Sequence, residues 1–176
     1  MSNLESEEGP VYRGNFSLPE VAETWTIAQN IPLGKWVYFN HGGRDEDIFF
    51  SFDPEISSDE IESNNYIERD ATLVSPPVKL KAGTKYQLSY EIRLFGTKFP
   101  AETRLMMWKS NGNSTITSEN KAKTLEHCIW PLDNFQWPVS SVKFSVKQTA
   151  AYHFALRICN AVPMQFHWLS IFEDNQ

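Results

Sequence analysis

The side chains that most often carry out chemistry are sparse in this sequence, and their spacing does not suit it. The four histidines form no HExxH or His-x-His metal motif, and no Cys-x-x-Cys pair occurs. The Gly-x-Ser-x-Gly signature of serine hydrolases and a glycine-rich phosphate loop are also missing. Glu91 and Glu102 could be the carboxylate pair of a glycosidase, although each also fits a surface position on a strand. These patterns argue against an enzyme.

Aromatic residues are a better indication of a binding site. Trp130 and Trp137 flank a segment that contains Asp133, Asn134 and Gln136, so rings and hydrogen-bonding groups lie close together in the chain. Exposed rings can stack on the apolar C–H face of a sugar, while amides and carboxylates bind its hydroxyl groups. We therefore predict a ligand site in this segment, with rings that only cap the ends of the fold as the alternative.

Trp108 is a further candidate for the ligand site. It ends a predicted strand just before the turn dipeptide Asn111-Gly112. Trp25 and Trp36, in contrast, lie within strands rich in core residues and are expected to be buried.

Residues 53–70 form a long irregular segment that is rich in Asp and Glu. Calcium binds carboxylate, amide and carbonyl oxygens, so such a segment could hold it. The acidic residues do not have the spacing of a calcium loop, which favours a solvated acidic loop. We predict no cofactor, with a structural calcium ion as the alternative.

Cys128 and Cys159 are the only cysteines. Two cysteines in a domain of this size could pair, and the count alone does not decide the matter. Two free thiols are the favoured interpretation, and a disulfide is the alternative.

Length and charge restrict the class of protein. The chain has 176 residues, 41% hydrophobic and 14% aromatic, which suits one domain with its own core. A net charge of −6 argues against a nucleic-acid surface, and no apolar run is long enough to span a membrane as a helix. Residues 1–10 are acidic and lack the features of a signal peptide. We expect a flexible acidic segment at 1–10 and a single domain at 11–176.

Alternating residues predict β-strands in most of the chain. Residues 85–94 have polar side chains on one side and apolar ones on the other, which is the period of a half-buried strand. Pro76-Pro77 cannot donate ladder hydrogen bonds and is expected at an edge, a bulge or a strand start. Further strands are predicted at 11–18, 23–29, 36–39, 48–52, 103–109, 128–132, 142–146, 152–159 and 165–172. Residues 119–127 are the best helix candidate, and a polar loop fits this short stretch equally well.

Three stretches resemble a known family. They are SPPVKLKAGTKYQLSY at 75–90, AYHFALRI at 151–158 and FHWLSIFE at 166–173. In this order they are similar to the jelly-roll domains called cleaved-adhesin or choice-of-anchor J domains, which occur in secreted and surface proteins of Bacteroides-type bacteria. The resemblance spans residues 11–174. It implies an all-β, antiparallel two-sheet jelly roll, similar to galactose-binding domains and carbohydrate-binding modules.

One departure from the family concerns calcium. Family members often close with an acidic pattern whose first Asp lies near a structural calcium ion. Leu169-Ser170-Ile171 occupies the matching place here, so the resemblance does not carry a calcium ligand to this chain.

The resemblance and the aromatic cluster together predict a non-catalytic binding or adhesion module of an exported protein, secreted or at the cell surface. A glycan is the first partner class, a surface protein the second, and neither nucleic acid nor membrane insertion is expected. The chief alternative is a structural accessory domain that mediates protein–protein contacts, and a hydrolase is the weakest of the three hypotheses.

Overall fold

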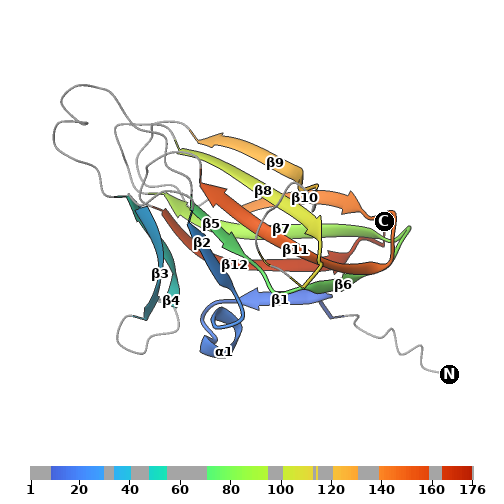
Figure 1. Cartoon of the computed structure of the whole chain (residues 1–176), viewed down its shortest axis with the longest axis horizontal. Helices are drawn as coiled ribbons and strands as arrows, with labels where there is room; N and C mark the ends of the chain where they lie inside the picture. Colours follow the sequence, from blue (N-terminus) through green and yellow to red (C-terminus); the bar gives the residue numbers. More distant parts are fainter. Residues whose placement is uncertain are drawn as a thin grey trace.

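The computed structural model describes residues 9–29, 34–40, 48–54, 71–94, 101–112, 114, 121–130, 139–158 and 164–175. Within these ranges the chain has twelve strands and one short helix (Figure 1). In chain order they are β1 (Tyr12–Asn15), α1 (Pro19–Ala22), β2 (Thr26–Gln29), β3 (Gly34–Asn40), β4 (Ile48–Pro54), β5 (Ala71–Val74), β6 (Val78–Leu80), β7 (Lys85–Leu94), β8 (Ala101–Lys109), β9 (Lys123–Trp130), β10 (Val139–Ser145), β11 (Ala150–Ile158) and β12 (Met164–Glu173).

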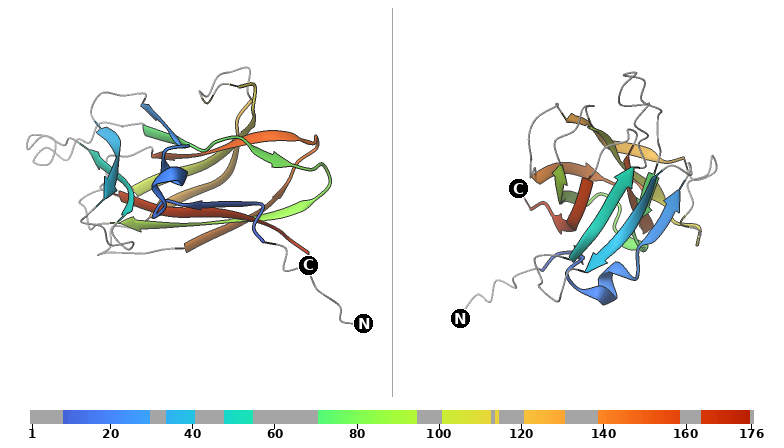
Figure 2. Two further views of the ribbon diagram at one scale, coloured as in Figure 1. Left: turned by 90° about the horizontal axis from the view of Figure 1, so that it is seen from below. Right: turned by 90° about the vertical axis from the view of Figure 1, so that its left-hand side faces the viewer.

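The strands form two antiparallel sheets that lie as two layers (Figure 2). The first sheet has the order β10-β7-β12-β4-β3, with β1 also paired to β12. The second sheet has the order β2-β5-β11-β8-β9, with β6 also paired to β11. Each sheet thus has six strands, and the predicted all-β sandwich is confirmed.

The core lies between the sheets and follows the alternation of the sequence. In β7, Leu88, Tyr90 and Ile92 are at most 1% exposed, whereas the residues between them reach solvent. Phe16 packs edge-on against the Trp25 ring at a centroid distance of 5.0 Å. Trp25 is buried, as predicted, while the side chain of Trp36 lies outside the described residues.

Pro76-Pro77 separates β5 from β6, as its missing hydrogen-bond donors predict. Both strands pair with β11, and Ser75 bridges the gap between them. The backbone N–H of Ser75 donates to the Phe154 carbonyl at 2.7 Å, and its hydroxyl accepts from the Phe154 N–H at 2.8 Å. The side chain of Ser75 thus satisfies a buried donor of β11 where the neighbouring strand is interrupted.

Two sequence-based predictions are corrected. The strand expected at 11–18 ends at Asn15, and a helical turn begins at Pro19, whose fixed φ suits the first position of a helix. The helix expected at 119–127 is wrong, because residues from Lys123 onward pair with β8 as the edge strand β9. Pairing with a neighbouring strand outweighs the weak helix preference of this short polar stretch.

No helix among the described residues is long and apolar enough to cross a membrane. In the part of the chain that the structure describes, no group of three or more His, Cys, Asp or Glu side chains could hold a metal ion. The acidic segment lies outside that part from residue 55 to residue 70, so the calcium alternative stays a prediction there.

Candidate functional site

The outward side of the first sheet carries polar and aromatic side chains in rows that cross four strands. Read from β1 through β12 and β7 to β10, two adjacent rows are Asn15–Trp168–Glu91–Val139 and Arg13–Ser170–Ser89–Ser141. The next row continues with Phe172, Gln87 and Lys143. Neighbouring strands are about 4.8 Å apart, so the side chains of one row form a continuous strip. We call this surface the β12 face.

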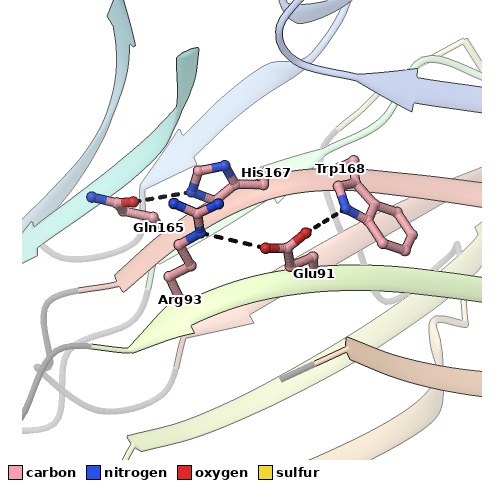
Figure 3. Close-up of polar contacts among 5 residues, drawn as sticks. All are labelled: Glu91, Arg93, Gln165, His167 and Trp168. Carbon is pink, nitrogen blue, oxygen red and sulfur yellow. Dashed lines mark hydrogen bonds and ion pairs between the residues drawn. The ribbon is translucent and has the colours of Figure 1, made fainter. Parts of the chain in front are cut away.

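A β-bulge in β12 gathers five side chains at one end of the β12 face (Figure 3). The register of β12 against β7 shifts around His167, which is the extra residue. Glu91 and Arg93 come from β7, whereas Gln165, His167 and Trp168 come from β12. The bulge therefore re-aims β12 so that Trp168 lies opposite Glu91.

Glu91 holds the Trp168 ring in place. The Trp168 indole N–H donates to Glu91 Oε2 at 2.6 Å, and Arg93 Nε lies 3.4 Å from Glu91 Oε1. Both carboxylate oxygens are thus engaged, and the Glu91 side chain is only 19% exposed. Hydrogen bonds to a charged, partly desolvated acceptor are shorter and stronger than neutral ones, so the half-buried ring has a fixed orientation.

His167 supports the bulge as a neutral side chain. Its Nε2 lies 3.0 Å from Gln165 Oε1, an arrangement in which the imidazole N–H donates to the amide oxygen. Burial lowers the pKa of His167 to about 4, and the nearby Arg93 guanidinium adds to the shift, while Glu91 opposes it. The imidazole is therefore uncharged at neutral pH.

The other end of the β12 face is marked by Phe172. Phe172 is 40% exposed and places a large apolar ring on the outward side of β12. A surface hollow of about 320 Å³ lies next to it, bordered by Gly9, Val11, Phe172, Glu173 and Asn175. Between Phe172 and Trp168 the outward positions of the neighbouring strands carry serine hydroxyls, and those of Ser89 and Ser141 are 2.8 Å apart.

The site residues predicted from sequence are only partly described by the structure. Trp130 is half-buried at the end of β9, packs against the core and donates its indole N–H to the Thr103 hydroxyl at 3.1 Å. Asp133, Asn134, Gln136 and Trp137 lie outside the described residues. The ligand site predicted for this segment therefore stays a prediction.

Trp108, the further candidate for the ligand site, is buried and offers no ring to a ligand at the surface. Trp108 is 2% exposed and packs with Val74, Met106 and Ala155 on the second sheet, away from the main core. Its ring lies 5.5 Å from that of His153, and its indole N–H has no hydrogen-bond partner among the described residues. These apolar neighbours bury the ring, although Trp108 is the next-to-last residue of β8.

Trp168 and Phe172 were not identified from the sequence. A signal was available, because β12 has large apolar residues on both of its sides. Leu169 and Ile171 are fully buried, which leaves Trp168 and Phe172 to the outward side. Two rings on the outward side of a strand whose other side fills the core make this side of β12 a candidate ligand surface.

The carboxylate pair considered for a hydrolase does not assemble. Glu91 projects from the outward side of the first sheet, whereas Glu102 belongs to β8 of the second sheet. Glu102 is engaged by the His127 ring at 2.7 Å and lies 3.8 Å from Arg104. Two carboxylates on different sheets, each held by its own partners, do not face a shared substrate.

A second polar cluster lies at the rim of the core and has a structural character. The Tyr90 hydroxyl donates to Glu126 Oε1 at 2.6 Å, and the Cys128 thiol lies 3.0 Å from the same oxygen. Burial and the neighbouring carboxylate raise the pKa of Cys128 to about 12, and they also raise that of Tyr90. Cys128 is a free thiol, which counts against the disulfide alternative.

Comparison with known proteins identifies the fold of this chain but no family. No protein-family model matches the chain, and no curated protein matches it. Many solved structures are similar. The CBM22-1 xylan-binding domain from Paenibacillus barcinonensis has a TM-score of 0.56 at 9% identity, over 94% of each chain. The C-terminal family 22 carbohydrate-binding module of Clostridium thermocellum xylanase 10B has a TM-score of 0.57 at 10% identity, over 96% of this chain and 97% of that one.

The K3 cleaved-adhesin domain of Lys-gingipain from Porphyromonas gingivalis is similar to the same degree. Its TM-score is 0.58 at 14% identity, over 93% of this chain and 97% of that one. The chain is thus a jelly-roll β-sandwich structurally like family 22 xylan-binding domains and a cleaved-adhesin domain. At these identities the resemblance shown is one of fold.

Proposed function

We propose that this chain is a non-catalytic carbohydrate-binding module of an exported protein, and that the β12 face is its binding surface. The observation that carries the proposal is the half-buried Trp168 ring, which lies on the outward side of the first sheet and is fixed by the 2.6 Å hydrogen bond to Glu91. The similar solved structures support it, because their names describe xylan-binding and adhesin domains.

The chemistry of the β12 face suits a sugar. A fixed indole offers an apolar surface to the C–H face of a pyranose at little cost in conformational entropy. Asn15 lies opposite Trp168 on β1, and its amide N–H groups are suited to donate hydrogen bonds to sugar oxygens beside the ring. A few directional polar groups around an apolar platform are the usual composition of a small-ligand site.

The loop identified from sequence is proposed as a second contact region. Asp133, Asn134, Gln136 and Trp137 follow directly after Trp130, at the end of β9. Variants of this loop and of the β12 face can be compared in one experiment.

A structural accessory domain is the competing function, and one observation favours it. Ile129 on β9 is 67% exposed and Val139 on β10 is 58% exposed, so large apolar side chains lie on two edge strands. Exposed apolar side chains on edge strands are typical of protein contacts.

Affinity electrophoresis in gels that contain neutral and acidic polysaccharides tests the proposal. We expect the wild type to be retarded by at least one polysaccharide and Trp168→Ala to lose most of that retardation. Ile129→Ala, an exposed position on the second sheet, is the matched control and should bind as the wild type does. Circular dichroism verifies that each variant is folded.

The outcomes separate the hypotheses. A folded wild type that binds no polysaccharide refutes the carbohydrate-binding function and leaves the accessory domain. Binding that survives Trp168→Ala and disappears in Trp137→Ala moves the site from the β12 face to the loop.

A further inference from the structure

Two aromatic rings stand on the same side of β12 with one residue midway between them. Trp168, Ser170 and Phe172 alternate with the fully buried Leu169 and Ile171, so all three side chains face outward. At about 3.4 Å per residue the two ring-bearing positions are about 14 Å apart along the strand. This separation is too long for one sugar ring to contact both residues.

Serine hydroxyls fill the space between the two ring-bearing positions. Ser170 pairs with Ser89 across β12 and β7, and Ser89 pairs with Ser141 across β7 and β10. A hydroxyl both donates and accepts a hydrogen bond, as the hydroxyls of a sugar do. Serine is also small, so these positions form a low strip between the taller Trp168 and Phe172 side chains.

The charged groups near this strip are mostly neutralised within the protein. Glu91 is engaged by Trp168 and Arg93, and the Lys143 ammonium lies 3.3 Å from Asp174 Oδ2. The serine positions carry no charge, and the chain as a whole has a net charge of −6. Arg13, exposed opposite Ser170 on β1, is the cation left beside the strip, and the net negative charge of the chain disfavours a polyanion there.

We infer that the ligand is a neutral, linear polysaccharide that lies along β12, with one sugar on Trp168, another on Phe172 and the intervening sugars over the serine strip. The inference rests on the proposed carbohydrate-binding function and adds the class and direction of the ligand. The hollow of about 320 Å³ beside Phe172 receives the sugar at that end.

Isothermal titration with neutral oligosaccharides of increasing length tests the direction. The oligosaccharides come from the neutral polysaccharide that retards the wild type in gels. Wild-type affinity should rise with length until the ligand reaches both rings and then level off. Phe172→Ala should bind the shortest ligands as the wild type does, should lose about tenfold in affinity for the longest, and should level off at a shorter length.

Ile27→Ala is the matched control. This side chain is 41% exposed, much like Phe172, but it lies on β2 at the edge of the second sheet and outside the β12 face. Its affinity should equal that of the wild type at every length. A Phe172→Ala variant with wild-type affinity for the longest ligand would overturn the proposed direction.

Salt dependence tests the class of ligand. Affinity for a neutral glycan should change less than about twofold between about 0.01 M and about 1 M salt, because charge makes little contribution. Preferential binding of acidic polysaccharides that weakens with salt overturns the inference of a neutral ligand. If the direction or the ligand class proves wrong, loss of binding in Trp168→Ala would still support the carbohydrate-binding function. A wild type that binds no glycan would refute both the function and the inference.

Discussion

His167 makes the stability of this protein depend on pH in a way that can be predicted from its surroundings. Its pKa is about 4 in the folded protein, against an ordinary value of 6.5, because burial disfavours the charged imidazolium and Arg93 repels it. The unfolded chain therefore binds a proton at a higher pH than the folded chain does. Stability from this residue is fully present above about pH 6.5 and is lost progressively as the pH falls towards 4.

The size of this effect follows from the shift in pKa. Each pKa unit corresponds to about 1.4 kcal/mol, so the full shift sets an upper limit of about 3 kcal/mol. His167 is 8% exposed, so some water reaches its ring. We therefore expect acidification to lower the free energy of unfolding by about 2 kcal/mol through this residue. This is a large fraction of the stability of a typical domain, about 5–15 kcal/mol.

Urea unfolding of the wild type and of His167→Gln, from about pH 7 to about pH 4, measures the effect. Glutamine keeps an N–H donor beside Gln165 but cannot be protonated, so the variant should lose less stability on acidification. The difference between the two proteins isolates His167 from the carboxyl groups that titrate in both. Identical pH dependence of stability in the two proteins would refute the reasoning. This holds with or without a constant offset in stability, because such an offset would report only altered packing.

Two further predictions concern the core and the thiol. Ser75→Ala leaves the buried Phe154 N–H without the acceptor that it has at 2.8 Å, and we expect a loss of about 1–3 kcal/mol in urea unfolding. A much smaller loss would mean that water or a shifted strand satisfies that donor. Cys128 should react with iodoacetamide at least about tenfold more slowly in the native protein than in urea, because its raised pKa of about 12 leaves little thiolate. The measurement uses a Cys159→Ser background, and equal rates in both conditions would contradict the buried, carboxylate-bound thiol.

The alternation of apolar and polar residues determined the fold class. The pattern at 85–94 corresponds to β7, and its inward residues are fully buried in the core. Pro76-Pro77 indicated the interruption between β5 and β6, because proline lacks a donor whatever its neighbours are. These are local properties of side chains and backbone, and a sequence contains them directly.

The binding face depended on contacts between distant parts of the chain. Glu91 and Trp168 are 77 residues apart, and only the register of β7 against β12 brings the carboxylate to the indole. That register includes a bulge at His167, which decides the side of the sheet on which Trp168 lies. Trp108 shows the reverse case, because packing on the second sheet buries a ring that the sequence offered as a ligand-site candidate.

The sequence by itself therefore determined most of the strands, although not the first half of β9, and which strand sides are apolar, because these follow from a period of two residues. The tertiary structure alone decided which strands are neighbours, where the one-residue shift falls and hence which rings meet polar partners at the surface. The physical reason is that strand pairing is non-local, and a shift of a single residue moves a side chain from the core to solvent.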